Sequence, residues 1–323
     1  MMTSRHAIFI TVITTALCSA PVQAQAFPTH AVRIVVALAP GGGTDNLTRI
    51  IAPKLTELLG QSFVVENRAG AGGQIGSDYV AKAPADGYTI LNVDTSFASN
   101  PSLFRKLPYD SLKDFAPVSL LASAPVALII HPSVPAHSLR ELLTLAKARP
   151  ALFNFAMGGY GSATHLGIEQ FRAATKIDVV VIPYKGGGPA TSDVLAGQVV
   201  MMFGGPSSLA QHVATGRLRA LAVTGTQSIP ALPGVPTFSS AGLPAVNAGS
   251  YWGSLVPAAT PREVINTLSS AMVKALQMPD VRQRLIALGY EPLGSTPDEF
   301  ASNLKSEIAK WAKAAKDANF RVD

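Results

Sequence analysis

Two glycine-rich turns carry the groups that could bind an anionic ligand. The first, PGGGTD at residues 40–45, follows the apolar run VRIVVALA; the second, GGYGSATH at residues 158–165, follows FNFAM. Glycines leave backbone N–H groups accessible, and a helix that begins there adds the positive end of its dipole. Each turn therefore predicts an anion site. For the first turn alone, a tight strand-to-helix connection without a ligand is the alternative.

Hydroxyl groups accompany both turns, Thr44 in the first and Ser162 and Thr164 in the second. Hydrogen bonds from such donors to a carboxylate contribute about 1.5–3 kcal/mol each, so three or four of them hold an anion without Arg or Lys. Part of this energy is spent on ordering two lobes around the ligand, which leaves a dissociation constant of about micromolar.

Motifs of enzymes and metal sites are absent from the sequence. It contains no HExxH pair, no Walker A motif and no GxSxG elbow, and its histidines lack the spacing of metal ligands. Ser162 and His165 lie three residues apart but have no evident acidic partner, which disfavours a nucleophile with its base. We expect a binding protein without metal or cofactor, and keep an exported hydrolase as an alternative.

Composition and the N-terminal segment indicate an exported globular protein. The chain has 323 residues, 48% of them apolar, and a formal net charge of +6 from dispersed Lys and Arg, so nucleic acid is not an expected partner. Residues 1–26 combine Arg5, a short apolar run and small residues before two candidate cleavage sites, after Ala24 and after Ala26. This pattern predicts a signal peptide and a periplasmic location. Cys18, the only cysteine, is removed with it, so the mature chain has no disulfide.

Strands and helices are predicted to alternate in two series. Apolar, β-branched runs bounded by turn residues predict the strands, which are residues 32–38, 62–66, 88–93, 115–121, 126–131, 153–157, 179–184, 199–203, 218–223 and 251–256. Helical spacing and capping residues predict the helices, which are residues 45–58, 76–83, 139–148, 166–175, 189–196, 209–215, 261–277, 279–288 and 297–318. Residues 94–100 are expected to form a polar loop at the carboxyl end of a strand, where ligands bind in parallel sheets.

This order of elements implies an α/β protein with two lobes and a ligand cleft between them. We expect residues 27–126 and 252–323 to form lobe 1 and residues 127–251 to form lobe 2, after a signal peptide at residues 1–26. Both glycine-rich turns should then face the same cleft.

Ordered sequence matches extend over essentially the whole mature chain. They are PGGGTD (40–45), VVENRAGAGGQIG (64–76), DGYTIL (86–91), NPSLFRKLPYD (100–110), LKDFAPVSLLAS (112–123), VIPYKGGGPA (181–190), RLRALAVTG (217–225) and LPGVPTF (232–238). In these stretches the chain resembles the tripartite tricarboxylate transporter solute-binding family, the Bug or TctC-like periplasmic receptors.

The resemblance implies a type II periplasmic-binding-protein fold that closes on a ligand carboxylate, partly through ordered waters held by two loops. Carried over to matching positions, it implies ligand-binding residues in both lobes and walls around them. These are Gly42, Gly43, Thr44 and Asp45 in lobe 1, Gly161, Ser162, Ala163, Thr164 and His165 in lobe 2, and Thr95, Ser96, Phe97 and Tyr184 as walls. We expect Asp45 to cap the helix, to pair with Arg49, or to meet a ligand amino group.

Two positions depart from the family pattern and are also expected at the ligand. Tyr160 stands where relatives often have Asn, and Gly204 where many have Asp. Without a carboxylate at position 204, recognition of a ligand ammonium group is weakened, while Tyr160 and Phe97 would add flat apolar surface. We therefore expect a dicarboxylate or an aromatic carboxylate, with a Tyr160 that points out of the cleft as the alternative.

The resemblance also implies partners. It predicts a monomeric receptor that delivers a small carboxylate to a membrane transporter with TctA-like and TctB-like subunits. A ligand-dependent partner of a membrane sensor kinase is a second hypothesis, because it needs the same pair of closing lobes. Loss of uptake or loss of induced transcription on deletion separates the two.

Overall fold

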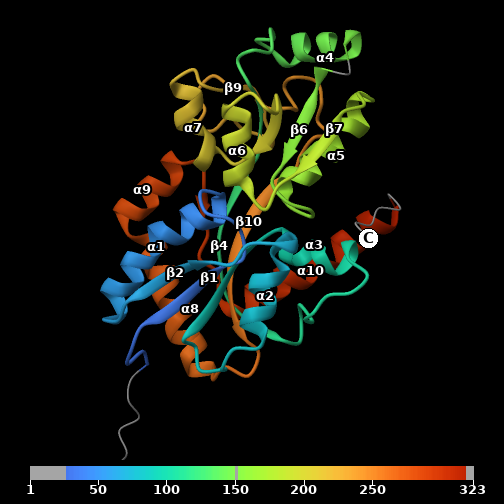
Figure 1. The fold of residues 1–323 in the computed structure, drawn as a ribbon. Helices are drawn as coiled ribbons and strands as arrows, with labels where there is room; N and C mark the ends of the chain where they lie inside the picture. Colours follow the sequence, from blue (N-terminus) through green and yellow to red (C-terminus); the bar gives the residue numbers. More distant parts are fainter. Residues whose placement is uncertain (1–26, 150–151, 318–323) are drawn as a thin grey trace, which may run out of the picture.

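The structure is a computed structural model that describes residues 27–149 and 152–317. The predicted signal peptide at residues 1–26 lies outside the described residues. Within the described ranges, no helix combines the length and apolarity needed to cross a membrane. Two β-sheets, each covered by helices on both faces, organise this part of the chain into two lobes (Figure 1).

Lobe 1 is built on a six-stranded sheet. Its strands are β1 (Val32–Val36), β2 (Phe63–Asn67), β3 (Thr89–Asp94), β4 (Phe115–Pro125), β10 (Gly249–Pro257) and β11 (Glu291–Pro292). Their order is β11-β4-β10-β3-β1-β2, with β1 parallel to β2 and β3, and β10 antiparallel to β3 and β4. The carboxyl ends of β1, β2 and β3 therefore meet at one edge, where ligands bind in parallel sheets.

Both faces of this sheet are buried. The helices of lobe 1 are α1 (Gly43–Leu59), α2 (Gln74–Ala81, preceded by η1, Ala71–Gly73), α3 (Ser96–Leu103), α8 (Arg262–Gln277), α9 (Pro279–Ala287) and α10 (Pro297–Asp317). Val32 and Ile34 pack in a core with α1, α8 and α9, whereas Val35 and Ala37 pack in a second core with α2, α3 and α10. Burial on alternate sides explains why the first strand is apolar at nearly every position.

Lobe 2 is built on a five-stranded sheet in the order β7-β6-β8-β5-β9. Its strands are β5 (Ala127–Ile130), β6 (Asn154–Met157), β7 (Val180–Pro183), β8 (Met201–Gly204) and β9 (Arg219–Val223), and its helices are α4 (Leu139–Ala148), α5 (Ala163–Thr175), α6 (Gly187–Leu195) and α7 (Pro206–Ala214). The helices α4 and α5 pack on one face, and α6 and α7 on the other.

Two chain segments connect the lobes. Val126 alone separates β4 from β5, and residues 224–248 lead from β9 back to β10. Figure 1 shows α8 and α10 on the lobe that contains the first strand. The exact division at residues 126/127 and 251/252 stays a prediction.

Each predicted strand is present within a few residues of its expected bounds. The prediction of a polar loop at residues 94–100 is wrong, because residues 96–103 form α3. That helix has no side-chain cap and contains Pro101, so it lacks the signals that mark a helix in a sequence. β11 also escaped prediction, because it consists of two residues.

Candidate functional site

A cavity of about 60 Å³ lies between the lobes, and both glycine-rich turns line it. Of the residues predicted at the ligand, Gly42, Gly43, Thr44, Ser162, Ala163, Thr164 and Gly204 line this cavity. The remaining lining residues are Leu38, Asp94, Gly158, Gly187, Thr191, Met202, Phe203, Gly205, Ser208, Leu209, Ser250 and Trp252.

Four helices begin at the cavity: α1 from lobe 1 and α5, α6 and α7 from lobe 2. The first turn of an α-helix has N–H groups without an intrahelical partner, and the dipole places partial positive charge there. The caps of α1, α6 and α7 are Gly42, Gly186 and Gly205, none of which supplies a side-chain cap. The cavity therefore presents N–H donors and positive potential, the combination that binds an anion.

Two aromatic side chains fix the position of the first turn by hydrogen bonds. Trp252 Nε1 donates a hydrogen bond to Thr44 Oγ1 at 3.1 Å, and Tyr290 Oη donates to the Gly43 carbonyl at 2.7 Å. The two rings contact each other edge to face, with centroids 5.0 Å apart. Because Thr44 Oγ1 accepts from Trp252, its own proton can point to a ligand.

The second turn is held by its own hydroxyl and imidazole groups. Ser162 Oγ donates to the Gly159 carbonyl at 2.7 Å and accepts from the backbone N–H of His165 at 3.3 Å, so it caps α5. His165 Nδ1 accepts the N–H of Gly161 at 3.1 Å, and burial lowers the pKa of this imidazole. His165 Nδ1 is thus used by Gly161, and the Ser162 hydroxyl donates to Gly159. Ser162 and His165 therefore hold the backbone of the turn, and the Ser162 hydroxyl is not directed to the imidazole as a nucleophile is to its base.

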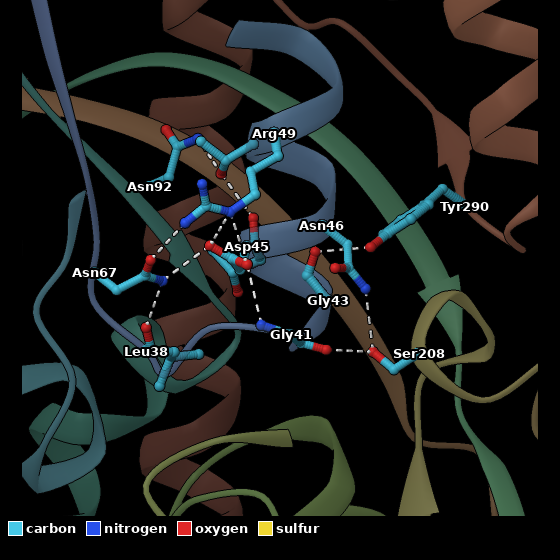
Figure 2. Close-up of polar contacts among 12 residues, drawn as sticks. Leu38, Gly41, Gly43, Asp45, Asn46, Arg49, Asn67, Asn92, Ser208 and Tyr290 are labelled. Carbon is cyan, nitrogen blue, oxygen red and sulfur yellow. Dashed lines mark hydrogen bonds and ion pairs between the residues drawn. The ribbon is translucent and has the colours of Figure 1, made fainter. Parts of the chain in front are cut away.

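Asp45 is paired within lobe 1 (Figure 2). It is not among the residues that line the cavity. Its carboxylate lies 2.9 Å from Arg49 Nε and accepts hydrogen bonds from Gly41 N–H and Asn67 Nδ2. Burial favours a raised pKa of Asp45, but hydrogen bonds from Arg49, Gly41 and Asn67 outweigh it and hold this pKa below its usual value. The expectation that Asp45 pairs with Arg49 is confirmed.

Contacts across the cleft show that the lobes are closed. Ser208 Oγ of α7 donates to the Gly41 carbonyl at 3.0 Å and accepts from Asn46 Nδ2 at 3.3 Å (Figure 2). At another point, Ser99 Oγ of α3 donates to the Gly161 carbonyl at 2.8 Å. A methyl group on Gly188 would lie 2.1 Å from the Pro40 carbonyl oxygen, so the two backbones are in direct contact.

The predicted wall residues lie behind the cavity lining. Phe97 is 2% exposed and packs between Tyr109 and Phe115 in the core of lobe 1, because α3 turns its side chain inward. Thr95 Oγ1 accepts from the N–H of Tyr251, and Ser96 donates to Asp94. These positions do not bring Thr95, Ser96 or Phe97 to the cavity.

In lobe 2 the structure likewise places four predicted residues outside the lining. Tyr160 packs edge to face on His165, with centroids 5.8 Å apart. Gly161 has φ +71° and its Cα lies close to Ser99, where a side chain would clash. Tyr184 Oη donates to Asp193 at 2.6 Å, and burial together with this carboxylate raises the pKa of Tyr184 to about 12.

Trp252 and Asp94 line the cavity but are not among the residues predicted to bind the ligand. Trp252 lies in β10, which overlaps the strand predicted at residues 251–256, and its indole supplies aromatic surface that was expected from Phe97. Asp94 is at the carboxyl end of β3, the position from which the polar loop at residues 94–100 was expected near the ligand. Across residues 27–149 and 152–317, no cluster of three or more His, Cys, Asp or Glu is arranged to hold a metal ion.

Two known proteins have sequences that align with nearly all of this chain. "Protein BugT" of Bordetella pertussis is 36% identical over 323 residues, which cover 99% of both chains. The "UPF0065 protein in tcbD-tcbE intergenic region" of Pseudomonas sp. (strain P51) is 39% identical over 305 residues, which cover 93% of this chain and 91% of that protein.

Solved structures agree with the fold. The "periplasmic binding protein BugD" has 33% identity and a TM-score of 0.88, with 91% of this chain and 99% of that chain covered. Two Rhodopseudomonas palustris proteins were solved with ligands: MatC with bound malate (32% identity, TM-score 0.83, coverage 89% and 99%) and a protein with adipate (34%, 0.87, 91% and 99%). These likenesses confirm the two-lobed α/β fold of periplasmic binding proteins.

The family model described as "Tripartite tricarboxylate transporter family receptor" matches residues 47–320. The chain therefore belongs to this family of receptors, the TctC family, whose members are substrate-binding proteins and not enzymes.

Proposed function

We propose that this protein captures a small carboxylate between its lobes in the periplasm and delivers it to a membrane transporter of the tripartite tricarboxylate type. The observation that carries the proposal is the convergence of four helix N-termini on one closed cavity with no Lys or Arg among its described lining residues. Such a cavity selects anions by N–H donors and helix dipoles.

A dicarboxylate is the ligand class that we favour over an aromatic carboxylate. Malate and adipate, the ligands of two structures about one-third identical to this chain, are both dicarboxylates. Phe97 and Tyr160, the two rings that suggested an aromatic ligand, do not line the cavity, whereas Trp252 and Phe203 do. The preference for a dicarboxylate therefore rests on the ligands of these two structures. Helix N-termini from both lobes provide donors for more than one carboxylate group.

Delivery to TctA-like and TctB-like subunits and removal of residues 1–26 on export are parts of the same proposal, supported by family membership. Deletion of the gene should abolish carboxylate uptake by intact cells. Retained uptake together with lost transcriptional induction would instead favour the partner of a sensor kinase.

The ligand class is tested by a thermal-shift screen of the mature protein. We expect dicarboxylates such as succinate, malate and adipate to raise the melting temperature, and isothermal titration to give a Kd of about micromolar for the best of them. Stabilisation by aromatic acids alone would overturn the dicarboxylate preference. An unchanged melting temperature with every carboxylate would overturn the proposed function.

A further inference from the structure

Asp94 is the one ionisable side chain among the described residues that line the cavity. It is the last residue of β3 and pairs in the sheet with Trp252 of β10, so its backbone position is fixed by two strands. A carboxyl group is an unusual component of an anion site, because it repels the ligand unless a donor lies between them.

The two oxygens of this carboxyl group have different surroundings. Asp94 Oδ1 accepts the N–H of Ser96 at 3.0 Å and its Oγ–H at 2.5 Å, which fixes the side-chain rotamer. No hydrogen bond or ion pair from another described residue reaches Oδ2. A carboxylate oxygen has lone pairs for two donors, so Oδ2 is an acceptor available to a molecule in the cavity.

The charges around Asp94 do not include a compensating cation. None of the ion pairs of the described residues involves it, and burial raises the pKa of its carboxyl group. Tyr251 on β10 is a titratable neighbour of Asp94, and its phenol stays neutral because burial raises its pKa well above the usual value. Positive potential at Asp94 therefore comes from the helix N-termini, which also attract the ligand carboxylate.

Resting on the proposed function, we propose that Asp94 is a specificity residue that accepts a hydrogen bond from a hydroxyl or ammonium group carried by the bound carboxylate. The ligand class is thus a hydroxy acid or an amino acid, with its carboxylate on the helix N-termini and its donor on Asp94 Oδ2. The absence of a carboxylate at Gly204 does not disfavour such a ligand, because Asp94 supplies one in the same cavity.

Matched sets of ligands test this inference, because their members differ in one substituent. The sets are succinate, malate and aspartate; glutarate, 2-hydroxyglutarate and glutamate; propionate, lactate and alanine; and 3-phenylpropionate, 3-phenyllactate and phenylalanine. Titration calorimetry of the wild-type protein should give at least one set in which the hydroxy or amino member binds about 10-fold or more tightly than the unsubstituted acid. Which of the two members binds more tightly identifies the donor.

The variant Asp94→Asn assigns that preference to the side chain. Asn keeps an oxygen for Ser96 and presents its amide nitrogen, a donor, to the cavity. We expect the preference for the substituted ligand to disappear or reverse, with no loss of affinity for the unsubstituted acid. Asp178→Asn, at an aspartate whose side chain is 95% exposed, is the matched control and should leave all affinities unchanged.

The outcomes separate the two proposals. Equal affinities within every set for the wild-type protein, or an unchanged preference in Asp94→Asn, overturn the role of Asp94 and leave the carboxylate receptor standing. Failure of every member of every set, and of every carboxylate in the thermal-shift screen, to bind the wild-type protein overturns the receptor proposal itself. The comparison of ligands on the wild-type protein does not depend on the folding of any variant.

Discussion

At the scale of single residues, Asp45 illustrates how an acidic side chain supports an anion site that it does not enter. Its carboxylate receives hydrogen bonds from Arg49, Asn67 and Gly41, so its charge is neutralised inside lobe 1. The Gly41 contact fixes the start of the glycine turn, which in turn orients the N–H groups of α1 toward the cavity. The acid is a support for the turn.

Replacement of Asp45 should lower the stability of the folded protein. We expect Asp45→Asn to lower the free energy of unfolding by about 1–3 kcal/mol, because a charged hydrogen-bond acceptor with three donors is lost. Urea denaturation at neutral pH measures the change. A loss equal to that of the exposed control Asp178→Asn would contradict the role assigned to Asp45.

The Asp45 carboxyl group should also make the stability of the fold depend on pH. The pKa of Asp45 is lower in the folded chain than its ordinary value of 3.8, so its contribution is complete above that value and is lost as the pH falls through the folded-state pKa. Between neutral pH and about pH 3, the wild-type protein should therefore lose more stability than Asp45→Asn. Parallel acid dependences of the two proteins would contradict this assignment.

The residues that could be predicted are those whose role follows from local spacing. Arg49 lies one helical turn after Asp45, so their ion pair could be anticipated from the sequence. The inward position of Phe97 could not, because it depends on α3, a helix without capping signals. Asp94 and Trp252 meet through the antiparallel pairing of β3 and β10, which are distant in the chain.

At the scale of elements, the helices that begin at the cavity differ in how they are capped. Ser162 caps α5 at the cavity by accepting a hydrogen bond from the N–H of His165. Ser138 caps α4 in the same way, by accepting from the N–H of Glu141, but it does not line the cavity. The two helices therefore offer a natural comparison between a cap that supports folding and a cap that also shapes a binding turn.

We expect Ser162→Ala and Ser138→Ala to cost similar stability, about 1 kcal/mol each, because each removes one helix N-cap. Only Ser162→Ala should also weaken carboxylate binding, by about tenfold, because Ser162 holds Gly159 and Thr164 in the turn. Calorimetric titration with the best ligand of the screen measures both variants. Equal ligand affinities of Ser162→Ala and Ser138→Ala would show that the second turn does not bind the ligand.

Most elements were predictable because their apolar residues recur with the period of a strand or helix. The order of strands in each sheet was not, because it is set by pairing between distant segments, such as β10 between β3 and β4. The closed cavity could not be predicted either, because it exists only where lobe 1 and lobe 2 meet.

At the scale of the whole molecule, closure rests on contact between two backbones. Gly188, in the first turn of α6, lies against Pro40 of the first glycine turn, where a methyl group would be 2.1 Å from the Pro40 carbonyl oxygen. Ser208 adds a hydrogen bond to the Gly41 carbonyl beside it. Each lobe folds around its own core, so these contacts affect closure more than folding.

Gly188→Ala should separate closure from folding. An alanine in the first turn of α6 is compatible with a helix, so we expect unchanged or slightly raised stability. Because the methyl group blocks the approach of Pro40, ligand affinity should fall by more than about tenfold. Small-angle scattering with saturating ligand should show a larger radius of gyration than for the wild-type protein.

Ser192→Ala, an exposed position on the same helix, is the control and should close and bind normally. Wild-type affinity in Gly188→Ala would mean that the ligand is held without the loop contact described above.

The backbone contact at closure has a consequence for how such receptors diversify. Gly41, Gly42 and Gly188 meet through main-chain atoms, so this part of the contact between the lobes does not depend on the side chains that face the ligand. A substitution at a position such as Asp94 or Gly204 can change which solute is captured while this main-chain contact stays the same. New specificities can thus arise by single steps, without a simultaneous change in the closing movement.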